Sequence, residues 1–350
     1  MTWMIYGATG YTGQLVAREA VRRGHRPLLA GRSAAKLEPL ADALGLSWTA
    51  VDLGDAAALR VAVEGVELVF HAAGPFIHTS APMLHACLAA GAHYVDITGE
   101  LPVFAHTFRH DAAARARGVA LMSGAGFDVV PSVSLAKHVA DQVPNATELH
   151  IAIAALSQAS VGTTKSMLEM LPEGVKVRRN GVLERQPFGV GAIDVRFTDH
   201  VRTVVPIPWG DLETAYRSTG VPNITTYMAV GSSTARLLAV VGPVVQRALR
   251  SYAARRIAQQ IVERVAQGPN EALRHAGCSY VWARAAHGAG HAVEAWLETA
   301  EAYQFTALAG VRAAETVLAQ RPTGALTPAQ AFGADWVLGI EGTRRLDRLQ

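Results

Sequence analysis

Residues 5–13 are Ile5-Tyr6-Gly7-Ala8-Thr9-Gly10-Tyr11-Thr12-Gly13, and they decide the fold of the first half of the chain. Glycines at three-residue intervals follow a short apolar run and lead into a segment with helical spacing. A strand that passes into a helix through glycines directs backbone N–H groups and the positive end of the helix dipole at one point, which suits a pyrophosphate. The position of this motif at the start of a βαβ pattern favours a dinucleotide site over an ordinary glycine turn.

Apolar runs and helical segments alternate through the rest of the first half. The expected strands cover 3–6, 26–30, 46–51, 66–72, 94–97 and 119–122, and the expected helices cover 14–23, 34–44, 56–63, 81–90 and 104–117. This alternation predicts an α/β fold with a Rossmann-type, doubly wound parallel sheet. Ligands of such a sheet bind beyond the carboxyl ends of its strands, so the loops there are candidate sites.

The loop after the second expected strand bears on the choice of dinucleotide. NAD sites have Asp or Glu at this strand end to bind the ribose hydroxyls. This chain instead has Gly31-Arg32-Ser33, with Lys36 one helical turn further on. A guanidinium group suits a 2′-phosphate, so the loop favours NADP over NAD. The alternative is that Arg32 is a solvated loop charge.

Three later loops are further candidates for contacts with the cofactor or the substrate. Asp52 follows the third strand and either meets the adenine edge or forms a plain turn. After the fourth strand, Ala73-Gly74-Pro75-Phe76 either lets the chain approach the nicotinamide ribose closely or is an ordinary Gly-Pro turn. After the fifth strand, Asp96-Ile97-Thr98-Gly99-Glu100 either orients substrate or ribose, or forms a helix N-cap before Pro102.

The chain lacks the Tyr-x-x-x-Lys pair that short-chain dehydrogenases use for catalysis. None of its eight tyrosines is followed by Lys four positions later. A Rossmann-type sheet without this pair needs another source for the proton that accompanies hydride transfer, so the sequence argues against a short-chain dehydrogenase mechanism.

Ordered motifs link the chain to a known family. They are the glycine loop at 7–13, Ala30-Gly31-Arg32-Ser33, Ala73-Gly74-Pro75-Phe76, the segment 93–100, Gly126-Phe127-Asp128-Val129-Val130-Pro131-Ser132 and Leu326-Thr327-Pro328-Ala329. With these motifs the chain resembles the saccharopine dehydrogenase-like oxidoreductases, and most of all the branch that includes the trans-acting enoyl reductases. The chain departs from the family at Ile77-His78-Thr79-Ser80-Ala81, where the family has a Tyr-Gly turn.

The resemblance implies three parts of the chain. Residues 1–145 would form an NADP-binding Rossmann domain, and 146–300 would form an α+β domain for substrate and dimerisation, built on a mixed sheet. Residues 301–350 would return to the Rossmann domain. Within the second part, Asn180-Gly181 between β-type runs predicts a hairpin, and Gly288-Ala289-Gly290 predicts another. A homodimer through this sheet is expected.

Residues 234–266 have the spacing of an amphipathic helix with several arginines. A helix that covers the second domain is the default expectation, and a membrane-surface or partner helix is the alternative.

The candidate residues for chemistry follow from these loops. The proton donor or substrate anchor is expected to be Asp128, Glu100 or His78, in that order, whereas His71, on a strand, is expected to be a core histidine. Thr163 and Ser166, on a short helix, and Trp209, in a loop after a strand, are candidate substrate contacts. Trp209 has a structural aromatic as its alternative role.

Composition limits the classes of function. A net charge of +3 with scattered Lys and Arg argues against nucleic-acid binding. The two cysteines, Cys87 and Cys278, lie far apart, so neither a disulfide framework nor a metal site is expected. Without a recognisable secretion signal or an apolar span, the chain is expected to be soluble and cytoplasmic.

These observations together predict an NADP-dependent oxidoreductase that transfers hydride to or from a small, apolar carbonyl or enoyl substrate. A chain with only 17% charged residues suits such a substrate better than an amino-diacid, which would require clustered arginines. A non-enzymatic NADP-binding sensor or interaction protein is the alternative.

Overall fold

The computed structural model describes residues 3–155, 160–187, 190–231, 241–242, 244–265, 269–288 and 290–349. The chain forms two units, which are described separately. The first consists of Met1–Asp128 with Tyr303–Ala331, and the second of Val129–Ala302 with Phe332–Gln350. The sequence prediction had divided the chain at 145 and 300, so the segment after Asp128 and the last residues of the chain belong to the second unit instead.

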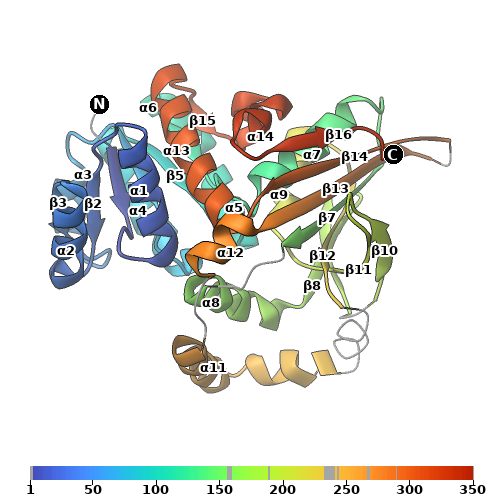
Figure 1. Ribbon diagram of the computed structural model, residues 1–350, viewed down its shortest axis with the longest axis horizontal. Coiled ribbons are helices and arrows are strands. Elements are labelled where there is room, and N and C mark those ends of the chain that lie inside the picture. The colour runs from blue at the N-terminus through green and yellow to red at the C-terminus, as the bar shows by residue number, and fades with distance from the viewer. Residues whose placement is uncertain are drawn as a thin grey trace. The chain divides into compact units, whose positions relative to one another are not determined.

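A parallel sheet forms the centre of the first unit, as predicted (Figure 1). The central strands Trp3–Tyr6 and Leu68–His71 are fully buried because helices cover the sheet, which is typical of doubly wound folds. In spatial order the described strands are β15 (Gly324–Ala325), β6 (Ala120–Met122), β5 (His93–Asp96), β4 (Leu68–His71), β1 (Trp3–Tyr6), β2 (Leu28–Gly31) and β3 (Trp48–Ala50). The order reverses on either side of β1, so the sheet has the switch point at which dinucleotides bind.

Helices connect these strands and bury their apolar sides against the sheet. They are α1 (Tyr11–Arg22), α2 (Ala34–Leu44), α3 (Ala56–Val63), α4 (Phe76–Ala90), α5 (Leu101–Arg109) and α6 (Asp111–Arg117). Helix α4 begins five residues before the predicted start at residue 81, and the predicted helix 104–117 is divided into α5 and α6.

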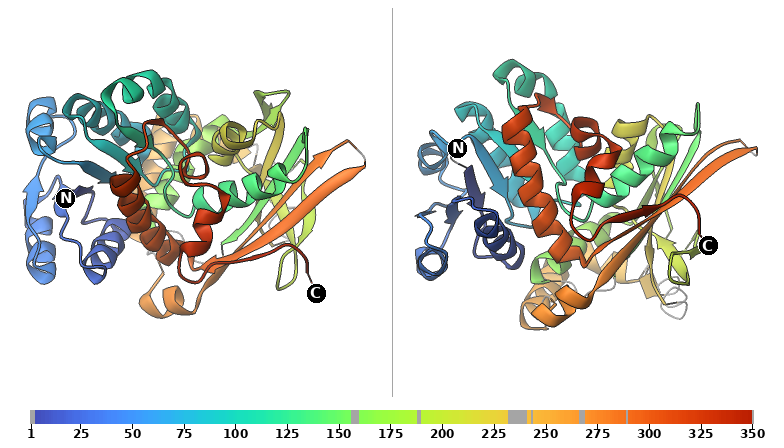
Figure 2. Two further views of the ribbon diagram at one scale, coloured as in Figure 1. Left: turned by 90° about the horizontal axis from the view of Figure 1, so that it is seen from above. Right: turned by 45° about the horizontal axis from the view of Figure 1, so that its top comes forward.

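The late segment of the first unit adds a long helix and the seventh described strand. Helix α13 (Ala302–Gln320) runs along the parallel sheet (Figure 2), where a Cβ on Gly310 would stand 2.7 Å from the ring of Phe70. The chain then forms β15, which the sequence prediction had missed. A reciprocal pair of hydrogen bonds between Thr327 and Gln330 caps α14 (Pro328–Phe332).

A mixed sheet forms the second unit, as predicted. In spatial order its main path is β10 (Ile193–Arg196), β11 (Val201–Pro206), β12 (Asn223–Ala229), β7 (Glu148–Ala155), β13 (Cys278–His287), β14 (His291–Ala300) and β16 (Arg344–Leu346). Two further strands lie off this path: β8 (Val175–Arg179) pairs with β12 and with β9 (Val182–Gln186). Both predicted hairpins are confirmed, β8–β9 and β13–β14 being antiparallel. Asn180 and Gly181 both have positive φ, as a two-residue hairpin turn requires.

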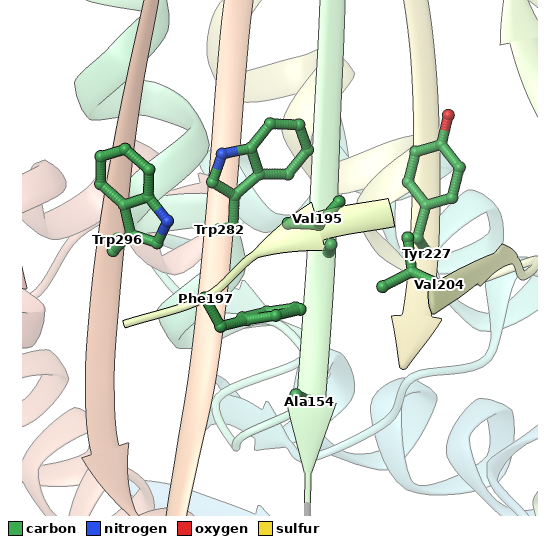
Figure 3. Close-up of a cluster of buried hydrophobic side chains, with 8 residues drawn as sticks. Ala154, Val195, Phe197, Val204, Tyr227, Trp282 and Trp296 are labelled. Atoms are coloured by element: carbon green, nitrogen blue, oxygen red, sulfur yellow. The ribbon is translucent and has the colours of Figure 1, made fainter. Parts of the chain in front are cut away.

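The two faces of this sheet are covered differently. Helix α7 (Val130–Asp141) packs on β7, β13 and β14, and α9 (Asp211–Thr219) and the 3₁₀ helix η2 (Ala334–Gly339) pack against α7. An aromatic cluster occupies the other face (Figure 3), where Trp282 and Trp296 are register partners and Phe197, directly after β10, belongs to the same cluster. The indole of Trp296 donates to the carbonyl of Arg196 at 2.7 Å, which ties the β10 segment to the sheet.

The remaining described helices of the second unit are α8 (Val161–Met170), the 3₁₀ helix η1 (Leu171–Glu173), α11 (Tyr252–Val265) and α12 (Glu271–Ala276). Helix α11 covers part of the predicted helix 234–266, but residues 232–240, 243 and 266–268 of that segment lie outside the described residues. Among the described residues, no helix is long and apolar enough to cross a membrane.

Candidate functional site

The glycine loop between β1 and α1 is packed too closely to accept side chains at two positions. Gly7 has a φ of 85°, and a Cβ there would stand 2.8 Å from the backbone nitrogen of Ala73. A Cβ on Gly13 would stand 2.2 Å from the carbonyl oxygen of Gly7. These glycines therefore let α1 approach the ends of β1 and β4, as a dinucleotide-binding turn requires.

The N-terminus of α1 is suited to an anion. Gly10 at the N-cap has no side chain with which to cap the helix, and the first turn contains no acidic residue. The first-turn N–H groups and the helix dipole therefore favour a phosphate. This loop fits the pyrophosphate of a dinucleotide, and its residues are those assigned from the sequence: Gly7, Ala8, Thr9, Gly10, Tyr11, Thr12 and Gly13.

Charged groups flank the hydroxyl of Tyr6 at the ends of β2 and β3. Tyr6 donates to the carbonyl of Val51 at 3.0 Å. Its pKa is raised to about 12, mainly by burial and also by the charge of Asp52, whereas the charge of Arg32 opposes the rise. Arg32 is exposed and forms no ion pair or hydrogen bond with any described residue, so its guanidinium is accessible to a ligand.

The other residues predicted to bind cofactor at the ends of β2 and β3 make fewer contacts. Ser33 is at the N-cap of α2 without a side-chain cap bond, and Lys36 is exposed in the first turn. Asp52 accepts the N–H of Gly54 at 2.8 Å, which is the plain turn that the sequence left as an alternative for this residue.

The end of β4 passes into α4 through Ala73, Gly74 and Pro75, with a cis peptide bond before Pro75. The hydroxyl of Thr79 donates to the carbonyl of Ala73 at 2.5 Å, which holds the loop against the first turn of the helix. Phe76 is buried at the start of α4.

Glu100 closes the N-terminus of α4. Its two carboxylate oxygens accept the N–H groups of Phe76 at 2.9 Å and Ile77 at 2.8 Å. The side chain is 1% exposed, and although Glu100 occupies the N-cap position of α5, it makes no side-chain cap bond there. Glu100 therefore stabilises a helix that begins 24 residues earlier in the chain.

Buried Asp96 organises the loops after β5 and β6. One carboxylate oxygen accepts the N–H groups of Thr98 and Gly124, and the other accepts the hydroxyl of Ser123 at 2.8 Å. Burial raises its pKa to about 6 against the opposing effect of these hydrogen bonds. Asp96 thus fixes the two strand ends that carry Glu100 and Asp128.

Asp128 lies directly against the loop after β5. A Cβ on Gly99 would stand 2.8 Å from its Oδ2, so only glycine leaves room for this carboxyl group. Burial and the nearby charge of Glu100 raise the pKa of Asp128 to about 7. The side chain keeps partial solvent exposure, and a carboxyl group with these properties can donate or accept a proton near neutral pH.

The two histidines near this loop differ in their surroundings. His71 is fully buried, as expected for a core residue, and burial lowers its pKa to about 3. Its Nε2 lies 3.1 Å from the hydroxyl of Thr79, which itself donates to Ala73, so His71 carries its proton on Nε2. His78, in the first turn of α4, is exposed.

The candidate substrate residues belong to the second unit. Thr163 and Ser166 lie on α8, and the hydroxyl of Thr163 is 3.2 Å from that of Ser160. Trp209 is partly buried just before α9. Their role in binding substrate stays a prediction.

Several polar contacts in the structure were not predicted from the sequence. They include the pair formed by Ser132 and Asp211, both fully buried, in which the serine donates to the carboxylate at 2.7 Å and so joins α7 to α9. Ser132 lies in one of the quoted family motifs, which was the available signal. Asp211 needed the tertiary structure because 79 positions separate the two residues.

Comparison with known families agrees with this geometry. Residues 3–122, which include all strands of the parallel sheet except β15, match the family described as the saccharopine dehydrogenase NADP binding domain. Residues 3–122 are therefore similar to saccharopine dehydrogenase NADP-binding domains. The resemblance inferred from the glycine loop and the later motifs is therefore confirmed.

The similarity to solved structures extends beyond this domain. Saccharopine dehydrogenase (L-Glu forming) from Saccharomyces cerevisiae matches with a TM-score of 0.67 over 99% of both chains, at 11% identity. That likeness shows the fold alone, and it confirms a saccharopine dehydrogenase-like architecture with a mixed-sheet second unit.

Curated relatives match over part of their length. The trans-acting enoyl reductase of Mycobacterium ulcerans is 33% identical over 138 residues, which is 37% of this chain and 33% of the relative. A Mycobacterium tuberculosis protein assigned by name to the same reductases is 34% identical over 184 residues, 48% of this chain and 43% of its own length. The chain thus spans less than half the length of these curated relatives.

Proposed function

We propose that this protein is an NADP-dependent oxidoreductase that transfers hydride to or from a small, apolar carbonyl or enoyl substrate. The observation that carries the proposal is Asp128, a carboxyl group with a pKa raised to about 7 in the segment between β6 and α7. It lies beside the loop that follows β5, and that loop belongs to the segment similar to saccharopine dehydrogenase NADP-binding domains.

Different loops would hold different parts of the cofactor. The glycine loop and the N-terminus of α1 would bind the pyrophosphate. Arg32, which is exposed and has no hydrogen-bond partner among the described residues, would bind the 2′-phosphate, with Ser33 and Lys36 beside it. The small residues at 73–75 would permit the chain to approach the nicotinamide ribose. NADP is therefore proposed over NAD.

The protein's own contribution to the reaction is orientation and a proton. NADPH, when bound, would supply a hydride, that is, one proton together with two electrons. Asp128 in its protonated form would donate the accompanying proton to the carbonyl oxygen, or to the second carbon of the double bond, and would be left as a carboxylate. Glu100 would act through position, because its carboxylate fixes the first turn of α4 and its charge keeps the pKa of Asp128 high.

The substrate class follows from the surface near this group. Ile77, whose N–H is held by Glu100, is 43% exposed, so an apolar side chain faces solvent at the start of α4. The segment that leads from β4 into α4 contains no clustered arginines of the kind that would bind an amino-diacid. Relatives named trans-acting enoyl reductases support an enoyl or carbonyl group as the reducible function.

Binding and turnover experiments test the proposal. The fluorescence of NADPH should change on mixing with the protein, and a panel of apolar enones and ketones should then oxidise it. Binding without turnover across the panel would favour the alternative of a non-enzymatic NADP-binding sensor. No binding, or a preference for NADH, would contradict the role of Arg32. The predicted cytoplasmic location and homodimer stay predictions.

A further inference from the structure

Three histidines come together on the helices that cover the sheet of the first unit. His85 lies on α4, His106 lies in the last turn of α5, and His110 lies between α5 and α6. One potential ligand atom from each ring lies within 4.8 Å of the other two. The three rings contact one another in pairs at a partly exposed surface, so their nitrogens are close enough to share one ligand.

The spacing of two of these rings matches a metal site. Nε2 of His85 lies 3.3 Å from Nε2 of His110. Two imidazole nitrogens bound to zinc at about 2.0–2.1 Å with a tetrahedral angle are about 3.3–3.4 Å apart. The two nitrogens therefore already stand at the separation that a bound ion would impose.

The hydrogen bond of His110 prepares its ring for coordination. Its Nδ1 lies 3.0 Å from the carbonyl oxygen of His106 and donates to it. A proton fixed on Nδ1 leaves the lone pair on Nε2, the atom that faces His85. Metal-binding histidines generally donate their other ring nitrogen in this way, which sets both the tautomer and the ring orientation.

The third ring has a buried nitrogen that no described residue satisfies. Nε2 of His106 is shielded from solvent and has no hydrogen-bond partner among the described residues. On its other side, Nδ1 lies 3.4 Å from a guanidinium nitrogen of Arg109, which is exposed and free to turn towards solvent. Coordination through Nε2 would transfer the ring proton to Nδ1, and Arg109 would then move away.

We propose that His85, His106 and His110 bind one divalent transition-metal ion of the zinc class, with a remaining coordination position open to solvent. Imidazole ligands suit zinc, copper and nickel, whereas magnesium and calcium prefer oxygen. The ion would join α4 to the α5–α6 segment on the outer side of the helices. The cysteine spacing predicts no metal site, although His106-x-x-x-His110 has the spacing of two ligands on adjacent helical turns.

Metal titration of the intact protein tests this site without reference to turnover. The protein is stripped with a chelator and titrated with zinc in a calorimeter, and cobalt is then added to report coordination geometry by its visible absorption. The variants are His85→Gln and His110→Gln. The matched control is His200→Gln, because His200 is an exposed histidine of the second unit. Arg109→Ala removes the contact that competes for His106.

One zinc ion per chain and a rise in Tm with zinc are expected. His85→Gln and His110→Gln should each weaken binding at least tenfold, His200→Gln should leave it unchanged, and Arg109→Ala should leave it unchanged or tighten it. Since His85 is exposed, its variant should fold and keep the NADPH affinity of the wild type. Absence of stoichiometric zinc binding, or the same affinity in wild type and His85→Gln, would overturn the proposal.

Discussion

Gly99 and the carboxyl group of Asp128 are in direct contact, so closely that a Cβ on Gly99 would stand 2.8 Å from Oδ2. The glycine lets the loop after β5 cover the carboxyl group, and the loop also carries Glu100. Burial and the charge of Glu100 together raise the pKa of Asp128 to about 7. A strand-end loop thereby converts an ordinary aspartate into a group that exchanges a proton near neutral pH.

The raised pKa of Asp128 predicts how reduction depends on pH. The proton donor must be protonated, so kcat/KM for reduction should be constant below pH about 7 and fall tenfold per pH unit above it. The pKa of Asp128 in the folded state lies above its ordinary value of 3.8. The stability that this group contributes is therefore complete below pH 3.8 and is lost as the pH rises through about 7. Initial rates and urea unfolding measured across this range check both statements.

The control for that profile is a carboxyl group elsewhere on the surface. Asp141 is exposed and pairs with Lys137 at 2.9 Å, so Asp141→Asn should leave the profile unchanged. A midpoint near pH 4 in the wild type would contradict the assignment.

Replacing Glu100 with Gln tests whether this residue acts through position. The amide can accept only one of the two N–H groups of α4, so the free energy of unfolding should fall by about 1–3 kcal/mol. Removing the negative charge should also lower the pKa of Asp128, and the midpoint of the rate profile should move to lower pH. Loss of turnover at every pH, with an unmoved midpoint in any residual activity, would make Glu100 itself the proton donor.

Replacing Arg32 with Ala tests the choice of cofactor. A charge-assisted hydrogen bond to the 2′-phosphate contributes about 1.5–3 kcal/mol, so Kd for NADPH should rise by about 10- to 100-fold and Kd for NADH should hardly change. Arg117, exposed on α6, provides the matched control, because its replacement by Ala removes the same charge from a distant helix. Fluorescence titration with both cofactors measures the effect, and equal losses for NADPH and NADH would refute the role of Arg32.

Replacing Gly13 with Ala tests the packing of the glycine loop. The added methyl group would stand 2.2 Å from the carbonyl oxygen of Gly7 and 2.9 Å from Cα of Ala8, and backbone atoms cannot move aside cheaply. The free energy of unfolding, measured by thermal unfolding, should fall by about 1–3 kcal/mol or more. NADPH binding should also weaken. Gly290→Ala, where nothing lies within 4 Å of the added methyl, should change neither quantity. Wild-type stability in Gly13→Ala would show that the loop can relax.

The sequence was sufficient for what depends on local pattern. The glycine loop, the alternation of strands and helices and the Asn180-Gly181 hairpin are each determined by neighbouring residues, and the structure contains all of them. The start of α4 could not be predicted in the same way, because its cap is the carboxylate of Glu100, 24 residues away. Strand β15 is only two residues long, too short for any periodicity to show.

The same distinction between local pattern and tertiary contact applies to the candidate site. Its loops could be found at strand ends, but the property that distinguishes Asp128 arises from its contact with Gly99 and from the charge of Glu100. The histidine cluster depends equally on tertiary contacts, since His85 and His110 are 25 positions apart. Local sequence identifies which groups are available, and packing determines their pKa values and their neighbours.

The most direct test of the account is turnover of NADPH by wild type and Asp128→Asn with the same apolar enone or ketone. Wild type should oxidise NADPH, and the variant should be slower by about 100- to 10,000-fold, as expected for loss of a general acid. Its Kd for NADPH should remain that of the wild type. Equal turnover by the two proteins, or NADPH binding by wild type without turnover of any substrate in the panel, would contradict the account.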